Sequence, residues 1–232
     1  MLSILIVIVV ALVIVFVTMP STIRTLKEKG IVGIDVHKPD RPEVAKGGGF
    51  IVLFAIVTAL LVDIGITTFQ SQGVVNPGIL AALVSILIAG MIGLLDDNLD
   101  FNNGPKILLP LIASVPMIVM QVGTTTMSIP FIGDVDLGIF YAILVVPLMM
   151  TFIIDSTNMY GGMNGLEAGL AIINSSAVIL YIFMLSMVTG LPASPQQIDS
   201  GVVAGALLGA SLAFMFFNKY PSKILPGDVG RL

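Results

Sequence analysis

Residues 77–100 read PGILAALVSILIAGMIGLLDDNLD, an apolar run that ends in a cluster of carboxylates. The apolar part, Pro77–Leu95, is long enough to cross a bilayer at about 1.5 Å per residue. Asp96 and Asp97 follow at once, and Asp100 lies one turn further on. Carboxylates beside hydrocarbon are costly, so an adjacent pair at the end of a span indicates a role with a cation or a phosphate. A solvated helix end is the alternative interpretation.

The composition of the 232-residue chain predicts an integral membrane protein. Hydrophobic residues make up 56% of it and charged residues only 10%, which is more apolar surface than a soluble domain of this length could bury. The chain has no Cys, which excludes a disulfide framework and a thiolate metal site. It also shows no internal repeat or low-complexity linker. We therefore predict one integral membrane domain over residues 1–232.

Seven apolar segments are long enough to cross a membrane at roughly 20 residues per span. They lie near Leu2–Thr18, Gly48–Thr68, Pro77–Leu95, Ile107–Val122, Leu137–Ile154, Leu166–Met187 and Gly201–Phe217. The first lacks the basic flank of a signal peptide, so it is expected to stay as a helix. The fold class predicted is an all-α polytopic membrane protein with about seven transmembrane helices.

The basic residues predict the orientation. Threading the spans places all 10 Lys and Arg residues in loops on one side of the membrane. By the positive-inside rule that side is cytoplasmic, and the N-terminus lies outside. The membrane would be the cell membrane, or the ER membrane in a eukaryote. On the outer side, the alternating residues 124–138, with Pro and Gly among them, predict a short β-hairpin.

Two more polar clusters face the predicted cytoplasm. Residues 155–167 read DSTNMYGGMNGLE, which suits either an ordinary turn between two helices or a ligand site. In the second case Asn158 could ligate a metal ion, and Asn164 could bind a base or a sugar. Near the end of the chain, Asp228 lies between two glycines. It could be a metal ligand on a tight turn, or part of a basic tail that contacts anionic lipid.

The loop 35–49, DVHKPDRPEVAKGGG, is the fourth polar element. Its basic groups would suit a diphosphate, and its glycines would suit a closely packed helix start. The glycine triplet alone is weak evidence, because it matches no complete phosphate-binding loop.

Taken in order, these motifs resemble the polyprenyl-phosphate N-acetylhexosamine-1-phosphate transferases of glycosyltransferase family 4. The resemblance covers Asp-Asp-x-x-Asp with Lys106 downstream, Asn158-x5-Asn164-Gly-Leu-Glu, and Tyr-Pro-Ser-Lys followed by Gly-Asp at Asp228. The runs KILLPLIAS at 106–114 and NGLEAG at 164–169 are most similar to the dolichyl-phosphate GlcNAc-1-phosphate transferases of eukaryotes and archaea.

The resemblance implies an enzyme that transfers N-acetylglucosamine 1-phosphate from UDP-GlcNAc to a polyprenyl or dolichyl phosphate, releasing UMP. It is the first step of lipid-linked oligosaccharide assembly. Mg²⁺ is the implied cofactor, with Mn²⁺ as an alternative. A lipid bilayer and a homodimer are implied partners, and no nucleic acid is expected.

The same resemblance assigns roles to individual residues. Asp96, Asp97 and Lys106 would be catalytic, with the lysine binding phosphate. Asn158 and Asp228 would hold the metal ion. The substrate contacts would be Asp100, Gly162, Asn164 and Lys46.

The chain also departs from the family pattern. The family has about ten helices and a His/Arg-rich cytoplasmic loop after the Gly-Asp motif, so we expect this chain to lack that loop and roughly three helices. Asp100, Asp155 and Leu225 replace the usual Asn, Asn and aromatic residue, and Lys46 replaces a Glu. Two alternatives follow: an inactive truncated remnant, or an Asp-rich intramembrane prenyltransferase. A transporter would place its charges at the midplane rather than at helix ends.

Overall fold

The structure is a computed structural model that describes residues 2–35, 38, 40–70, 75–99, 101, 103–160 and 163–230, apart from the side chains of residues 103, 159, 160 and 228. Its helices are α1 (Leu2–Glu28), α2 (Gly49–Gln70), α3 (Pro77–Leu99), α4 (Asn103–Val119), α5 (Val146–Tyr160), α6 (Leu166–Thr189) and α7 (Pro195–Asn218). A π-helical turn, η1 (Tyr141–Val145), precedes α5, and a 3-10 turn, η2 (Asp228–Gly230), follows α7.

Among the described helices, six are long and apolar enough to cross a membrane: α1, α2, α3, the run 141–158 that joins η1 to α5, α6 and α7. This confirms the predicted membrane fold. The predicted span Ile107–Val122 corresponds to α4, which has 17 residues and contains Pro110 and Pro116. Since α4 is shorter than each of these six spans, the count of seven spans stays a prediction.

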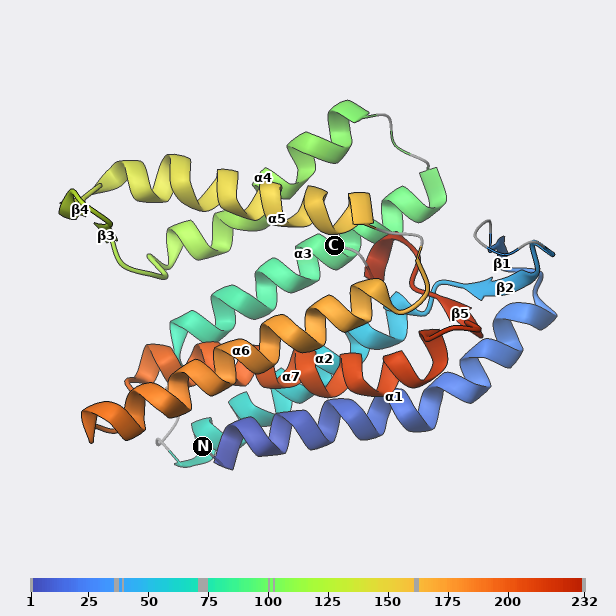
Figure 1. Ribbon diagram of the computed structural model, residues 1–232, viewed down its shortest axis with the longest axis horizontal. Helices are drawn as coiled ribbons and strands as arrows, with labels where there is room; N and C mark the ends of the chain where they lie inside the picture. The colour runs from blue at the N-terminus through green and yellow to red at the C-terminus, as the bar shows by residue number, and fades with distance from the viewer. Residues whose placement is uncertain are drawn as a thin grey trace.

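The helices form a bundle with an arm beside it (Figure 1). The bundle contains α1, α2, α6 and α7, and the arm contains α4 and α5. Helix α3 packs against α2 on one side and α4 on the other. A sheet-bearing end and a hairpin-bearing end lie at opposite extremes of the molecule in this view.

Close packing of α1 against α7 builds the core of the bundle. Gly201, Gly205 and Gly209 recur every four residues and so share one face of α7. A Cβ atom added at Gly209 would lie only 2.1 Å from the carbonyl oxygen of Ile8 in α1. The two backbones therefore touch, as small residues allow in membrane helix pairs. Ser194 and Gln197 cap the start of α7 reciprocally, with Pro195 in its first turn.

A three-stranded sheet joins the first loop to the segment after α7. Strands β1 (Val32–Ile34) and β2 (Glu43–Lys46) are antiparallel, and β5 (Ile224–Leu225) pairs parallel to β2. The sequence predicts a loop over residues 35–49, and the structure places β2 within it. The difference has a physical reason: β2 is completed by a partner that comes from the far end of the chain, and periodicity within the loop does not show it.

The predicted hairpin is confirmed. Strands β3 (Thr126–Ile129) and β4 (Gly133–Asp136) are antiparallel, with Thr126 opposite Asp136 and Ile129 opposite Gly133. Its position on the outer side of the membrane stays a prediction.

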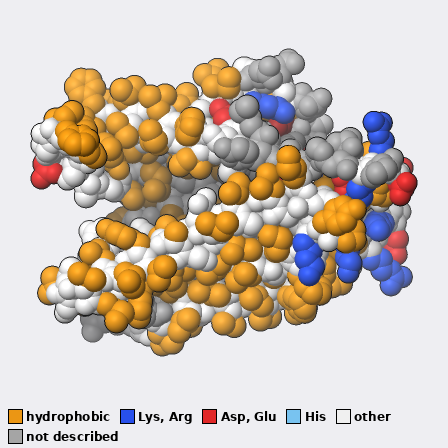
Figure 2. Space-filling model, viewed as in Figure 1, with side chains coloured by type: hydrophobic (Ala, Val, Ile, Leu, Met, Phe, Trp, Pro, Cys, Tyr) orange, Lys and Arg blue, Asp and Glu red, His pale blue; other side chains and the backbone are white. Residues whose placement is uncertain are grey.

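Lys and Arg side chains gather at the sheet-bearing end, where α1 ends (Figure 2). The helix surfaces away from that end are covered by hydrophobic side chains. This arrangement follows the predicted separation of the basic loops from the apolar spans.

Candidate active site

The two adjacent carboxylates in the last turn of α3 have different environments. Asp96 is buried, with 4% of its surface exposed. Its Oδ2 lies 3.0 Å from the Nζ of Lys106, and its Oδ1 accepts a hydrogen bond of 2.9 Å from the backbone N–H of Phe101. Asp96 therefore ties the end of α3 to the start of α4.

Asp97 faces the sheet and the segment after α7. Its Oδ1 lies 3.0 Å from the Nζ of Lys46, which ends β2. Its Oδ2 accepts a hydrogen bond of 3.3 Å from the backbone N–H of Val229. A Cβ atom at Gly227 would lie 2.9 Å from the same oxygen, and Gly227 has a positive φ of 73°. A larger residue at 227 would be strained and would crowd the carboxylate.

The glycines at 47–49 let two backbone segments approach closely. The N–H groups of Gly47 and Gly48 donate to the carbonyl oxygen of Leu225 at 3.1 and 3.0 Å, and that of Gly49 donates to Pro226 at 2.7 Å. A Cβ atom at Gly49 would lie 2.2 Å from the backbone nitrogen of Gly230. The triplet thus holds the turn 226–230 beside Asp97, which explains a motif that was weak evidence in the sequence.

A second polar cluster lies beyond the other end of the β1–β2 ladder. Asp35 is buried, with 3% of its surface exposed. Its Oδ2 accepts a hydrogen bond of 2.9 Å from the Nδ2 of Asn164 and lies 3.0 Å from the Nζ of Lys38. Gly165, which follows Asn164 in the sequence, donates its N–H to the Oδ1 of Asn218 at 2.9 Å. The turn before α6 is therefore fixed to both the first loop and the end of α7.

Asn158 lies near the end of α5, on the arm. An apolar groove of about 320 Å³ runs between α2, α3, α5 and α7, and Ile154, Val229 and Gly230 are among its lining residues. Asn158 follows Ile154 by four residues, which is one turn or about 6 Å further along the same helix face. Ile154 thus lines the same groove as the turn that contacts Asp97.

The sequence-predicted site residues fall into groups. Contacts join Asp97 to Lys46 and Asp96 to Lys106, so these four meet at the end of α3. Asn164 belongs to the second cluster. Asp228 begins η2, directly before the Val229 amide that contacts Asp97, while its side chain lies outside the described atoms. Asp100 and Gly162 lie outside the described residues. The roles assigned to all of these residues stay predictions.

The oxygen donors at this end suit a hard divalent cation. Carboxylate and amide oxygens, completed by water and substrate phosphate, are what Mg²⁺ prefers. The residues predicted to hold such an ion are Asn158 and Asp228. Within the described part of the chain, no three His, Cys, Asp or Glu side chains cluster as a ready-made metal site.

Sequence reasoning gave no role to three residues that the structure places in these clusters. Asp35 holds Asn164, Gly227 packs against the Asp97 carboxylate, and Val229 donates to it. Of these three residues, only Gly227 could be associated with the site from the sequence, because it precedes Asp228 in the Gly-Asp motif. The other two act through contacts between distant segments.

Comparison with known proteins identifies the family. The profile of glycosyl transferase family 4 matches residues 79–232. Over 229 residues, the chain is 36% identical to a protein of Saccharolobus solfataricus that is provisionally named UDP-N-acetylglucosamine–dolichyl-phosphate N-acetylglucosaminephosphotransferase; the match covers 99% of this chain and 67% of that protein. A protein of Dictyostelium discoideum with the same enzyme name is 27% identical over 239 residues, covering 90% of this chain and 58% of the relative.

A bacterial relative carries a different enzyme name. The phospho-N-acetylmuramoyl-pentapeptide-transferase of Thermodesulfovibrio yellowstonii is 30% identical over 249 residues, which covers 94% of this chain and 65% of that protein. The chain thus spans about two thirds of the length of its relatives, or somewhat less. The family profile covers more than half of the chain, and the similarity to the Saccharolobus protein extends over nearly all of it. This chain belongs to glycosyl transferase family 4.

Proposed function

We propose that the protein transfers N-acetylglucosamine 1-phosphate from UDP-N-acetylglucosamine to a polyprenyl or dolichyl phosphate. The products are a polyprenyl diphosphate N-acetylglucosamine and UMP. The names of the archaeal and Dictyostelium relatives support this reaction over the transfer of a muramoyl pentapeptide. The structural observation that carries the proposal is the contact of Asp97 with both Lys46 and the turn 227–230 at the end of a membrane helix.

The chemistry requires two phosphates to meet at the membrane surface. An oxygen of the lipid phosphate attacks the sugar-bearing phosphorus of the UDP-sugar, and the bond from that phosphorus to the oxygen of UMP breaks. UMP leaves with that oxygen, so atoms and charge balance without a covalent enzyme intermediate. Such transfers depend mainly on positioning and on stabilising charge. In this reaction Asp97 would orient or deprotonate the lipid phosphate.

The lysines supply positive charge to this site. Lys46 has 42% of its side chain exposed, so its ammonium can contact a phosphate as well as Asp97. Lys106 has 29% of its side chain exposed beside the buried Asp96. We expect the two cations to bind the diphosphate and the negative charge that develops as UMP leaves.

A divalent cation fits the oxygen donors at this end. Asn158 and Asp228 would hold Mg²⁺, with Mn²⁺ as an alternative, on the diphosphate. The bound ion would offset part of the negative charge on the phosphates. The homodimer that the resemblance implies stays a prediction.

The site should face the cytoplasm, where UDP-sugars are made. The positive-inside rule supports this orientation, because the Lys and Arg side chains gather at the sheet-bearing end (Figure 2). The hairpin β3–β4 would then lie on the outer side of the membrane, which is the ER lumen in a eukaryote.

A transfer assay tests the proposal. Membrane vesicles that contain the chain are given UDP-GlcNAc labelled in the sugar, a polyprenyl phosphate and Mg²⁺. We expect label in the lipid fraction and an equal amount of UMP. Asp97→Asn should lower the rate by about 10²-fold or more, the range for a residue that handles a proton in the reaction.

Asp134→Asn, which changes an acid in the hairpin at the far end, is the matched control and should keep the wild-type rate. Folded wild-type protein that transfers no label would contradict the proposal. Release of diphosphate from a prenyl diphosphate would instead indicate the prenyltransferase alternative.

A further inference from the structure

The end of α7 presents two lysines beside one aromatic ring. The Nζ atoms of Lys219 and Lys223 lie 5.3 and 6.0 Å from the centroid of the Phe216 ring. All three residues are exposed. Lys219 directly follows the apolar helix that ends at Asn218, so the two ammonium groups lie at the depth where lipid headgroups meet the membrane core.

The segment after α7 folds back on the helix end, which places Lys223 beside Lys219. The Lys223 N–H donates to the carbonyl oxygen of Phe217 at 2.9 Å. The buried Asn218 side chain donates from its Nδ2 to the carbonyl oxygen of Ile224 at 2.8 Å. These backbone contacts hold both lysines on the same side of the end of α7, where they share one ring.

The two lysines have no anionic partner within the described part of the chain. Among the described residues, no Asp or Glu oxygen lies within 4.0 Å of either ammonium group, and the observed ion pairs involve other cations. Two ammonium groups gathered at one ring repel each other, and an exposed ring attracts a cation only weakly. A phosphate between them would offset this repulsion. The pair therefore indicates a binding site for an anion.

An exposed apolar surface extends from the lysines along the membrane-spanning parts of α1 and α7. On α1 it contains Val9, Val13 and Phe16, whose spacing places them on one helix face. On α7 it contains Leu212 and Phe216, which are one turn apart. The rings of Phe16 and Phe216 join the two faces, with centroids 5.6 Å apart. A cationic end on an apolar strip is complementary to a phospholipid.

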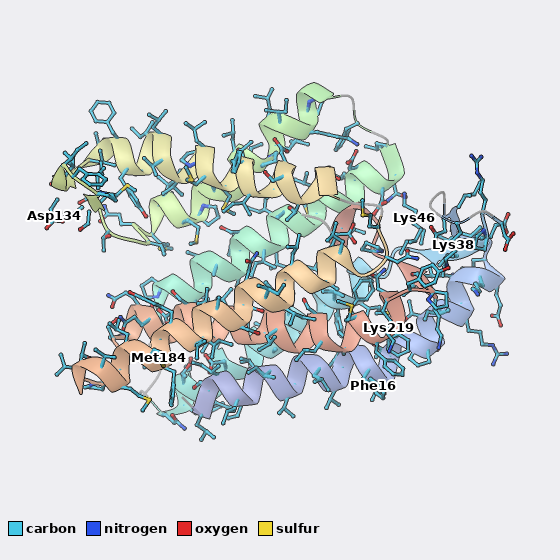
Figure 3. The ribbon with its side chains drawn as sticks, in the orientation of Figure 1. Phe16, Lys38, Lys46, Asp134, Met184 and Lys219 are labelled. Carbon is cyan, nitrogen blue, oxygen red and sulfur yellow. The ribbon has the colours of Figure 1, made fainter. Side chains whose placement is uncertain are left out.

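We propose that this surface, the α1–α7 lipid site, binds an anionic phospholipid, with its phosphate between Lys219 and Lys223 and its acyl chains along the apolar strip. The strip favours a lipid over a free phosphate, because it offers apolar contact that only a lipid can use. Phe16 and Lys219 lie along α1 and α7, whereas Lys46 lies nearer the end of α3 (Figure 3). The inference therefore concerns a different surface from the proposed phosphate site.

A single tryptophan provides the test, because the chain has none of its own. Phe216→Trp keeps an aromatic ring beside the lysines, and the indole face attracts cations best. The whole chain with this change is reconstituted into vesicles of equal parts phosphatidylglycerol and phosphatidylcholine. In one sample the phosphatidylglycerol carries bromine on its acyl chains, which quenches indole fluorescence on contact, and in the other the phosphatidylcholine does. Brominated phosphatidylglycerol should quench more strongly.

The lysines should account for this preference. One lysine near an anionic surface changes binding about fivefold, so adding Lys219→Met should lower the preference for phosphatidylglycerol by about that factor. Adding Lys223→Met as well should remove it. Lys219→Arg, which retains the charge, should keep it. Lys29→Met is the control for loss of an exposed lysine at the same end of the molecule, and it should also keep the preference.

Phe50→Trp is the matched control for the position of the probe. Phe50 and Phe216 are both 50% exposed, and Phe50 lies at the start of α2, at the sheet-bearing end. No described lysine lies over its ring, so the two brominated lipids should quench this probe equally. If Phe216→Trp does not fold, Phe16→Trp places the indole on the neighbouring ring position.

Three results would overturn the proposal. Equal quenching by both lipids, or a preference that survives loss of both lysines, would show ordinary lipid contact at this surface. Weak quenching by both lipids would show that protein, such as a second copy of the chain, covers the ring. Loss of the preference in excess soluble glycerol phosphate would indicate a site for free phosphate. None of these readouts depends on transfer activity, so such a failure would leave the proposed function untouched.

Discussion

The Nζ of Lys46 lies 3.0 Å from the Oδ1 of Asp97, which joins the end of strand β2 to the last turn of helix α3. The Lys46 side chain is 42% exposed, whereas the Asp97 side chain is only 17% exposed and its Oδ1 is buried. The Lys46 ammonium is partly hydrated, which limits what the pair contributes to stability. If Lys46 binds phosphate as proposed, we expect its replacement to affect phosphate binding more than folding.

Replacing Lys46 should affect catalysis more than folding. We expect Lys46→Met to lower kcat/KM for UDP-GlcNAc by about 10²-fold, since one charge-assisted contact to a phosphate is worth roughly 1.5–3 kcal/mol. The melting temperature in detergent should change little. Lys29→Met, at an exposed position just after α1, is the control for loss of a lysine at this end. Equal rates for the two variants would remove Lys46 from the site.

Replacing one residue of the Asp96–Lys106 pair should, unlike replacing Lys46, lower the stability of the protein. Asp96 is 4% exposed, so removing Lys106 alone leaves a buried carboxylate without its cation. Breaking a buried pair in this manner costs about 3–5 kcal/mol. We expect Lys106→Met to lower the thermal unfolding temperature clearly, and Asp96→Asn to lower it less.

A double variant tests whether the two residues act on stability together. Asp96→Asn with Lys106→Met should be more stable than Lys106→Met alone, because no unpaired buried charge remains. Additive losses would show that the two side chains contribute independently.

Gly49 should be intolerant of any side chain. A Cβ atom there would lie 2.2 Å from the nitrogen of Gly230 and 2.8 Å from the carbonyl oxygen of Pro226, and neither backbone atom can move cheaply. We expect Gly49→Ala to displace the turn 226–230 from Asp97 and to abolish most transfer activity. Gly65→Ala, in the same helix, is the matched control, because no atom lies within 4 Å of its added Cβ. Since Ala favours helix by roughly 0.5–1 kcal/mol, this control should retain activity and stability. Similar activity in both variants would contradict the packing described for Gly49.

The hairpin should loosen in acid. The Gly138 N–H donates to the Oδ1 of Asp136 at 3.0 Å, and this bond, followed by one from the Thr125 side chain, lowers the pKa of Asp136. A lowered folded-state pKa adds stability that is present above the ordinary value of 3.8 and is lost as the pH falls below it. Hydrogen exchange of the Gly138 amide should therefore accelerate in that range, relative to the intrinsic rate. In Asp136→Asn this extra acceleration should disappear. An unchanged profile would remove the carboxylate as its cause.

The local sequence pattern was sufficient to predict the helices and the hairpin. The apolar run before Asp96 predicts α3 almost to its last turn, because burial in lipid depends on hydrophobicity and length alone. The alternation within 124–138 gives β3 and β4 for a similar reason, since their partners are neighbours in sequence. The observed helix ends differ more from the predicted ones. Helix α1 continues to Glu28, ten residues past the predicted end at Thr18, because a helix can extend beyond its apolar portion.

Pairings between distant segments could not be predicted. The sheet depends on β2 meeting β5, and the second polar cluster depends on Asp35 meeting Asn164. Neither pairing leaves a periodic mark in the sequence. The site residues that the family resemblance implies stay predictions, and the resemblance did not indicate that Asp96 turns toward α4 while Asp97 turns toward the sheet.

Convergence of β2 and α3 can be measured directly by cross-linking, because the chain has no cysteine of its own. Lys46→Cys combined with Asp97→Cys is treated in membranes with a flexible bis-maleimide that spans a lysine and an aspartate side chain, and Lys46→Cys combined with Asp136→Cys is the control. The first pair should cross-link within one chain, and the control should not, because β4 lies at the opposite end of the molecule (Figure 1). Singly labelled thiols without a cross-link in the first pair, or equal cross-linking in both, would contradict a shared site at the end of α3.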